Sequence, residues 1–199
     1  MPRSAEDFEV VVARLDAPAG ELRACLSRAE LERAERFRFE HLRRRFIVAR
    51  ARLRQLLGAR LGLAPQAVEL ASGANGKPLL AQGGLHFSSS HSGDVALFGF
   101  SPVEIGVDIE ALRPVAEADA IAEQVFTPRE KDAYSALAAR DKPLAFLNCW
   151  TRKEALVKAL GSGLGVPLER LETAGTPGWW LHSFFPLPGF IAAVACYRG

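Results

Sequence analysis

Four charged side chains in two short segments are of the types that handle phosphate groups and divalent cations. Around Asp108 and Glu110, apolar and polar residues alternate as in a β-strand, so both carboxylates point to the same face. A segment of strong helix formers places Glu154 and Lys158 one turn apart on one helix face. Three carboxylates favour a hard ion such as Mg²⁺ over zinc, and the ammonium suits a phosphate.

The same residues also have an ordinary structural interpretation. Acid pairs on strands are usually solvated at a sheet edge, and a Glu and a Lys four residues apart usually form a surface pair contributing about 0.3–0.5 kcal/mol. Each motif by itself is more often structural than catalytic. It is their combination in one chain that favours a functional site.

The elements that must position these residues follow from periodicity and turn signals. Strands are predicted over residues 9–15, 68–71, 85–89, 95–100, 105–110, 168–173, 179–185 and 190–197. Helices are predicted within 21–37 and over 40–61, 117–125 and 141–160. A further helix begins after Thr127, the predicted N-cap, where Glu130 completes a capping box. Glu130 therefore has a structural role that needs no catalysis.

The order of elements repeats along the chain. In each half a long helix is followed by a short strand and then a hairpin, and Leu61–Pro65 after the first long helix is echoed by Leu164–Pro167 after the second. This order predicts an α+β fold of two similar lobes, residues 1–101 and 102–199, related by a pseudo-twofold. A crevice between two such lobes is a usual place for a ligand.

Ser90 and His91 fall in a predicted turn, residues 90–94, that joins two strands. Hydroxyl, imidazole and backbone N–H donors in one small turn could cradle an anion. A single histidine in a turn is, however, more often a surface residue.

Composition indicates a folded globular chain. The 199 residues are 49% hydrophobic, enough for one large domain or two small lobes. The net charge is only +2, but the first 100 residues carry 15 Lys and Arg against 11 Asp and Glu. This basic surplus could meet a polyanion.

Ten arginines lie between Arg33 and Arg60. For most of them a solvated polar face is the better interpretation, although a few could hold phosphate through bidentate hydrogen bonds. Nucleic-acid binding is the rival use, and the nearly neutral overall charge and the lack of a nucleic-acid motif argue against it.

Cysteine usage and the first residues favour a soluble cytoplasmic protein. Cys25, Cys149 and Cys196 are isolated from one another, which fits a reducing compartment rather than a disulfide framework. The N-terminus has no apolar signal core, and no apolar run is long enough to span a bilayer.

Five segments, taken together and in order, resemble the 4′-phosphopantetheinyl transferases of the Sfp type, which are single chains of two similar lobes. The matching segments are Asn75–Pro78, His86–Gly93, Ile105–Glu110, Phe126–Glu130 and Trp150–Lys158. Chance would have to supply order and spacing as well as composition, so the combination is specific. The resemblance extends from about Arg33 to the last strands, and the segment before about Ala29 has no match.

The resemblance implies transfer of phosphopantetheine from coenzyme A to a serine of an acyl or peptidyl carrier protein, by a monomeric enzyme that uses Mg²⁺. The implied metal ligands are Asp108, Glu110 and Glu154. The implied coenzyme A contacts are Arg33, Arg45, Gly76, Lys77, Pro78, Ser90, His91 and Lys158. The implied general base is Glu154, acting directly or through a metal-bound water, with Glu130 as second candidate. A coenzyme-A-binding protein of the same fold without turnover is the alternative.

Overall fold

The structure is a computed structural model that describes residues 8–73, 77–161 and 167–198. Its strands are β1 (Glu9–Arg14), β2 (Leu70–Ser72), β3 (Pro78–Leu80), β4 (His86–Ser92), β5 (Val95–Ser101), β6 (Ile105–Ala111), β7 (Trp179–Phe184) and β8 (Phe190–Tyr197). Its α-helices are α1 (Arg28–Glu35), α2 (Glu40–Leu61), α3 (Ala118–Val125), α4 (Pro128–Ser135) and α5 (Lys142–Leu160). Short 3₁₀ helices are η1 (Glu21–Cys25), η2 (Pro65–Ala67) and η4 (Leu168–Arg170).

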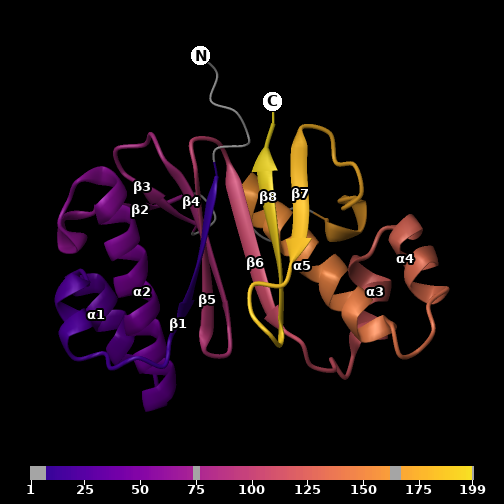
Figure 1. Ribbon diagram of the computed structural model, residues 1–199, viewed down its shortest axis with the longest axis horizontal. Helices are drawn as coiled ribbons and strands as arrows, with labels where there is room; N and C mark the ends of the chain where they lie inside the picture. Colours follow the sequence, from indigo (N-terminus) through magenta and orange to yellow (C-terminus); the bar gives the residue numbers. More distant parts are fainter. Residues whose placement is uncertain (1–7, 74–76, 162–166, 199) are drawn as a thin grey trace.

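Two three-stranded antiparallel sheets lie at the centre, with strand orders β1-β5-β4 and β6-β8-β7 (Figure 1). When β1, β4 and β5 are matched with β6, β7 and β8, the two orders are identical. The predicted α+β fold with a repeated arrangement is therefore confirmed.

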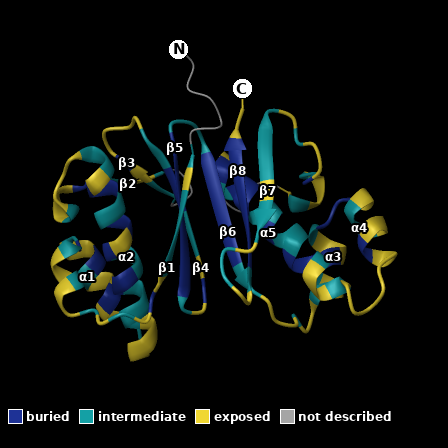
Figure 2. Ribbon diagram, in the orientation of Figure 1, coloured by how far each residue is buried: buried dark blue, intermediate teal, exposed yellow. Residues whose placement is uncertain are grey.

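The two sheets and the two long helices form four layers, with α2 outside the first sheet and α5 outside the second (Figure 1). Val10 and Val12 of β1 point inward and pack with Val107 of β6 in the core between the sheets. Val11 and Ala13 of β1 point outward, against the core beneath α2. The strands β5, β6 and β8 are the most buried elements, while the outer faces of the helices are exposed (Figure 2).

A buried ionic network fastens α1 to α2. Glu30 of α1 accepts hydrogen bonds from Arg50 and Arg54, at 2.7 and 2.6 Å. Arg54 is only 4% exposed and also donates to the carbonyl oxygens of Pro65 and Val68. Arg50 and Arg54, which belong to the arginine-rich segment, are thus not on a solvated polar face.

Helix α5 rests directly on strand β6 because Gly106 has no side chain. A Cβ at this position would lie 1.9 Å from the carbonyl oxygen of Ala155 and 2.4 Å from the nitrogen of Ala159. Both long helices end at a glycine with positive φ, Gly62 at 68° and Gly161 at 65°, the conformation that commonly terminates helices. The helix and strand that carry the predicted acids are therefore in backbone contact.

Two sequence predictions of secondary structure are wrong. Residues 168–173 contain η4 and no strand, and two of their carbonyl oxygens, Leu168 O and Leu171 O, accept hydrogen bonds from Lys153 instead of pairing with a strand. Ser90 and His91 lie in β4 and not in a turn, because the hairpin turns only after Ser92. Among the described residues, no helix is both long enough and apolar enough to cross a membrane.

Candidate active site

Strands β4 and β6 are the facing edges of the two sheets, and their seam carries a cluster of polar side chains. Ser90 Oγ donates to Asp108 Oδ1 at 2.7 Å. Lys158 Nζ, on α5, donates to the same Oδ1 at 2.6 Å and to Ser90 Oγ at 2.9 Å. Three residues that sequence analysis singled out, from three separate segments, therefore meet at one point.

The carboxylate of Asp108 is buried, with only 4% of the residue exposed. Its Oδ1 accepts two hydrogen bonds, but its Oδ2 is buried and has no hydrogen-bond partner. A buried charged oxygen without a partner is costly, so it has the capacity to bind a cation or a donor.

Glu110 lies on the same face of β6 as Asp108, as predicted. Its Oε2 accepts a hydrogen bond from Ser92 Oγ at 2.9 Å. Burial raises the pKa of Glu110, and the negative charge of Asp108 adds to that rise against the opposing hydrogen bond from Ser92. The pair of acids is thus held together at an energetic cost that a cation would relieve.

Glu154 of α5 is half-buried and faces the same acids. Burial raises the pKa of Glu154, and the charges of Asp108 and Glu110 raise it further, while Lys158 opposes them. Electrostatically the three predicted metal ligands are neighbours. Within the described part of the chain, however, no three His, Cys, Asp or Glu residues are grouped closely enough to hold a metal ion.

The donor chemistry of this site fits Mg²⁺ even so. Carboxylate oxygens are the ligands that this hard ion prefers, and it usually keeps several waters and shares phosphate oxygens of a substrate rather than filling its shell from the protein. A bound cation would give the Oδ2 of Asp108 a partner. It would also favour the ionised forms of Glu110 and Glu154, whose pKa values are raised in its absence.

A cavity of about 480 Å³ opens beside this cluster, between α1, α2 and β4. Five of the predicted coenzyme A contacts line it together: Arg33, Arg45, Pro78, Ser90 and His91. The remaining lining is mostly apolar. The fold therefore places cations, a hydroxyl and an imidazole from distant segments around one cavity.

Two cations of this cavity have different partners, Asp16 outside the lining for Arg45 and the lining residue Phe46 for Arg33. Arg45 Nε donates to Asp16 Oδ1 at 3.1 Å, and the guanidinium carbon of Arg33 lies 5.4 Å from the ring centre of Phe46. His91 is exposed at the cavity, yet partial desolvation and the charges of Lys158 and Arg45 lower its pKa. A bound phosphate would reverse that effect by favouring the protonated imidazole.

Lys77 has a different environment from the one expected. Its Nζ lies 3.5 Å from Glu104 Oε2 and from the carbonyl oxygen of Ala159, and 3.4 Å from that of Ile105. Burial lowers its pKa. The ammonium thus links the end of α5 to the start of β6 and does not line the cavity, whereas Gly76 lies outside the described residues.

Glu130, the second candidate base, is fully engaged elsewhere. Its capping box with Thr127 is present in both directions, as predicted. Its Oε1 accepts from the N–H and the hydroxyl of Thr173, and its Oε2 lies 2.7 Å from Nζ of Lys153. Lys153 is completely buried, and no sequence pattern had distinguished it from a surface lysine.

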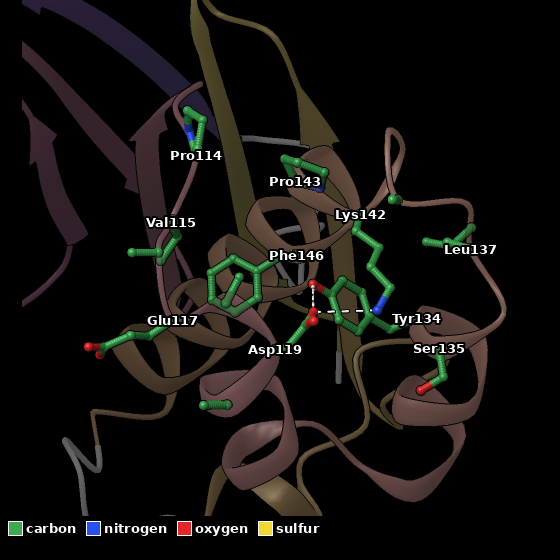
Figure 3. Close-up of a pocket in the computed structure, with 14 residues that line it drawn as sticks. Pro114, Val115, Glu117, Asp119, Tyr134, Ser135, Leu137, Lys142, Pro143 and Phe146 are labelled. Carbon is green, nitrogen blue, oxygen red and sulfur yellow. Dashed lines mark hydrogen bonds and ion pairs between the residues drawn. The ribbon is translucent and has the colours of Figure 1, made fainter.

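A second cavity, of about 750 Å³, lies between α3, α4 and the start of α5 (Figure 3). Tyr134 Oη donates to Asp119 Oδ1 at 2.7 Å, and Lys142 Nζ lies 3.5 Å from the same oxygen. Desolvation and this hydrogen bond raise the pKa of Tyr134 to about 12. None of the predicted site residues lines this cavity.

Two family models match the chain. Residues 104–179 match the model described as 4′-phosphopantetheinyl transferase superfamily. Residues 20–102 match the model described as 4′-phosphopantetheinyl transferase, N-terminal. The two matches adjoin one another between β5 and β6, at the point where the second sheet begins.

Similar proteins bear related names. The chain is 39% identical over 199 residues to 4′-phosphopantetheinyl transferase HetI of Nostoc sp., covering 91% of this chain and 84% of that protein. It is 30% identical to a 4′-phosphopantetheinyl transferase of Bacillus subtilis, covering 78% of this chain and 71% of that one. Against 4′-phosphopantetheinyl transferase psf-1 of Bacillus pumilus the identity is 31%, covering 68% of this chain and 58% of that protein's length.

Proposed function

The chain belongs to the 4′-phosphopantetheinyl transferase superfamily, and on that basis we propose that it moves the phosphopantetheine group of coenzyme A to a carrier-protein serine. The serine oxygen forms a bond to the β-phosphorus of coenzyme A. The bond from that phosphorus to the bridging oxygen breaks, and adenosine 3′,5′-bisphosphate leaves with the electron pair. The observation that carries the proposal is the meeting of Ser90, Asp108 and Lys158, of which Ser90 also lines the cavity that contains Arg33, Arg45 and His91.

The cavity of about 480 Å³ between α1, α2 and β4 is the proposed binding site of coenzyme A. Arg33, Arg45 and His91 supply donors for its phosphates, and arginine is well suited because its fork matches phosphate oxygens. Pro78 contributes an apolar wall for the adenine end. We assign Lys77 a supporting role, since its ammonium is directed at Glu104 and two carbonyl groups.

Asp108, Glu110 and Glu154 are the proposed ligands of Mg²⁺. A bound Mg²⁺ would supply positive charge that offsets the charge on the diphosphate. The ammonium of Lys158, beside Asp108, supplies a second positive charge from the protein itself. Because the reaction is phosphoryl-type, positioning and charge neutralisation provide most of the rate.

Glu154 is the proposed acceptor of the serine proton. Glu154 is half-buried and faces Asp108 and Glu110, and a bound Mg²⁺ would favour its ionised form, the form that can accept a proton. Glu130 is unsuited to the task because its oxygens are engaged by Lys153, Thr127 and Thr173. The proton therefore moves from the serine hydroxyl to a carboxyl oxygen of Glu154.

We also propose the domain organisation, the compartment and the oligomeric state. The repeated strand order supports two lobes, 1–101 and 102–199, with the site at the β4–β6 seam between them. Three free cysteines support a reducing, cytoplasmic environment. The chain supplies all the proposed site residues itself, so we assign it as a monomer.

The test is to incubate the protein with coenzyme A, Mg²⁺ and an apo carrier protein and to weigh the carrier by mass spectrometry. We expect a gain of one phosphopantetheine group on a single serine. A panel of apo carriers from fatty-acid, polyketide and nonribosomal-peptide systems covers the carrier preference. No gain on any carrier, with coenzyme A binding intact, would favour a binding protein of this fold without turnover.

A further inference from the structure

Alternate residues of β4 reach across the seam to β6 through serine hydroxyls. Ser88 Oγ accepts the N–H of Val107 at 3.1 Å, and Ser92 Oγ accepts the N–H of Ala111 at 3.1 Å. These hydroxyls satisfy backbone donors on the open edge of β6, which would otherwise be buried without partners. Ser90, between them, bonds to Asp108 instead.

The hydroxyl of Ser92, unlike that of Ser88, also donates a hydrogen bond to a carboxylate. The Ser92 hydroxyl donates to Oε2 of Glu110 at 2.9 Å while it accepts from the next residue of the same strand, Ala111. Ser92 is 9% exposed, so water offers little competition for either bond. One hydroxyl therefore ties the Glu110 carboxylate to the backbone of its own strand.

Glu110 needs such a tie because it shares a strand face with Asp108. Two like charges at this spacing repel each other, and the Glu110 side chain has enough rotatable bonds to turn away. The donated hydrogen bond limits that rotation. It leaves the second oxygen, Oε1, as the atom available to a ligand.

We propose that Ser92 is a positioning residue: its hydroxyl holds Glu110 in the orientation in which the carboxylate binds the divalent cation. The proposal rests on the metal-binding role of Glu110 proposed above. Partners that orient a metal ligand typically contribute 10–100-fold to metal affinity, although they never touch the ion.

Ser88 provides a matched control on the same strand. It is 5% exposed and its hydroxyl makes the same kind of bond to a β6 N–H, yet it contacts no carboxylate. Ser88→Ala and Ser92→Ala each remove one hydroxyl–backbone bond across the seam. Any effect of weakening the seam is therefore common to both variants, and only Ser92→Ala also releases Glu110.

The experiment titrates Mn²⁺, as a probe for Mg²⁺, into the wild-type protein and the variants and follows free Mn²⁺ by electron paramagnetic resonance. We expect Ser92→Ala to raise the dissociation constant about 10–100-fold and Ser88→Ala to change it less than about twofold. Ser92→Thr, which keeps the hydroxyl, should restore most of the affinity. Thermal unfolding should show similar losses for the two alanine variants.

The kinetics of phosphopantetheine transfer provide a second test of the same proposal. In Ser92→Ala the Mg²⁺ concentration for half-maximal transfer should rise by the same factor, and kcat at saturating Mg²⁺ should approach the wild-type value. Equal Mn²⁺ affinities for Ser92→Ala and Ser88→Ala, with Glu110→Ala clearly weakened, would overturn the role of Ser92 alone. Wild-type affinity in Glu110→Ala would overturn the metal assignment and this inference together.

Discussion

Two lysines of helix α5, Lys153 and Lys158, each pair with a carboxylate whose side chain is less than 10% exposed, and the two pairs differ in how completely their bonding capacity is used. The three donors of Lys153 go to Oε2 of Glu130 and to the carbonyl oxygens of Leu168 and Leu171, at 2.7–2.8 Å. Glu130 in turn accepts hydrogen bonds from the N–H groups of its capping partner Thr127 and of Thr173. This pair has no remaining capacity for a ligand.

The pair five residues further along the helix is incomplete. Lys158 is 30% exposed, and Oδ2 of Asp108 is buried with no partner. Burial of an ion pair therefore does not by itself mark a functional site. A saturated pair fixes the fold, whereas a pair with an unmatched oxygen and an accessible ammonium retains the atoms that a substrate or ion can bind.

Removal of the unmatched carboxylate is expected to have the largest effect. Asp108→Ala should lower kcat/KM for carrier modification about 10³-fold, because it deletes a buried charge aimed at the reacting groups. Thermal unfolding and circular dichroism should remain close to wild type, since Lys158 is exposed enough to be solvated. Glu123→Ala, an exposed acid on α3, is the control. Wild-type turnover by Asp108→Ala would remove the distinction between the two pairs.

Removal of the saturated lysine should act on stability instead. Lys153→Met leaves Glu130 buried without its cation, so we expect the free energy of unfolding to fall by about 3–5 kcal/mol. Denaturant titration measures this change. Turnover per folded molecule should stay within about twofold of wild type. Lys131→Met, at a surface pair with Glu123, should cost less than about 1 kcal/mol.

The two candidate bases can be compared in the same way. Glu154→Gln should lower kcat about 10²-fold or more, the typical contribution of a general base. Glu130→Gln keeps the shape of the side chain and should lower kcat less than about threefold while reducing stability. Single-turnover kinetics with a saturating apo carrier separates the chemical step from binding. The reverse order of effects would assign the base to Glu130.

In the absence of metal, a change of pH is expected to have a smaller effect, and this effect is on the free energy of unfolding. Burial and the charges of Asp108 and Glu110 raise the pKa of Glu154 above 4.5, so the native state keeps this proton at pH values where the unfolded chain has lost it. The associated stability is complete at low pH and is lost as pH rises through the raised pKa.

The side chain introduced by Glu154→Gln stays neutral at every pH, so this variant serves as the reference. With EDTA present, the Tm of Glu154→Gln should exceed that of wild type at pH 8. The difference should shrink toward pH 4.5, and other titrating groups cancel between the two proteins. A difference independent of pH would contradict the raised pKa.

The smallest effect is expected at the repeat-related position. Gln55 stands as far before the capping Gly62 as Glu154 stands before Gly161. The strand beneath it presents Val11 and Ala13 where the other sheet presents its acids. Gln55→Ala should therefore change kcat/KM less than about twofold in the carrier-modification assay.

Much of the site was predictable because it depends on local periodicity. Strand alternation placed Asp108 and Glu110 on one face, and helical spacing placed Glu154 and Lys158 together. The capping box at Thr127 and the helix ends at glycine were likewise predicted correctly. These features need only neighbouring residues to be recognised.

The features that were missed depend on distant partners. Nothing near Lys153 or Arg54 in the sequence marks them as buried, because their partners come from other elements. Ser90 and Ser92 were assigned to a turn on the strength of their residue types, whereas this segment pairs with β5 as far as Ser92, opposite Val95, and is therefore a strand. Such tertiary effects override local propensity.

The two sheets have the same strand order but present different side chains to their long helices, and this difference determines how many ligands a chain takes up. Strand β6 presents Asp108 and Glu110 beside Lys158 of α5, whereas Glu9, on the face of β1 that carries Val11 and Ala13, is paired with Arg60 of α2. Calorimetric titration with coenzyme A should therefore give a stoichiometry of one per chain. Saturation curves should be hyperbolic, because a chain with one binding site has no second site with which binding could be cooperative.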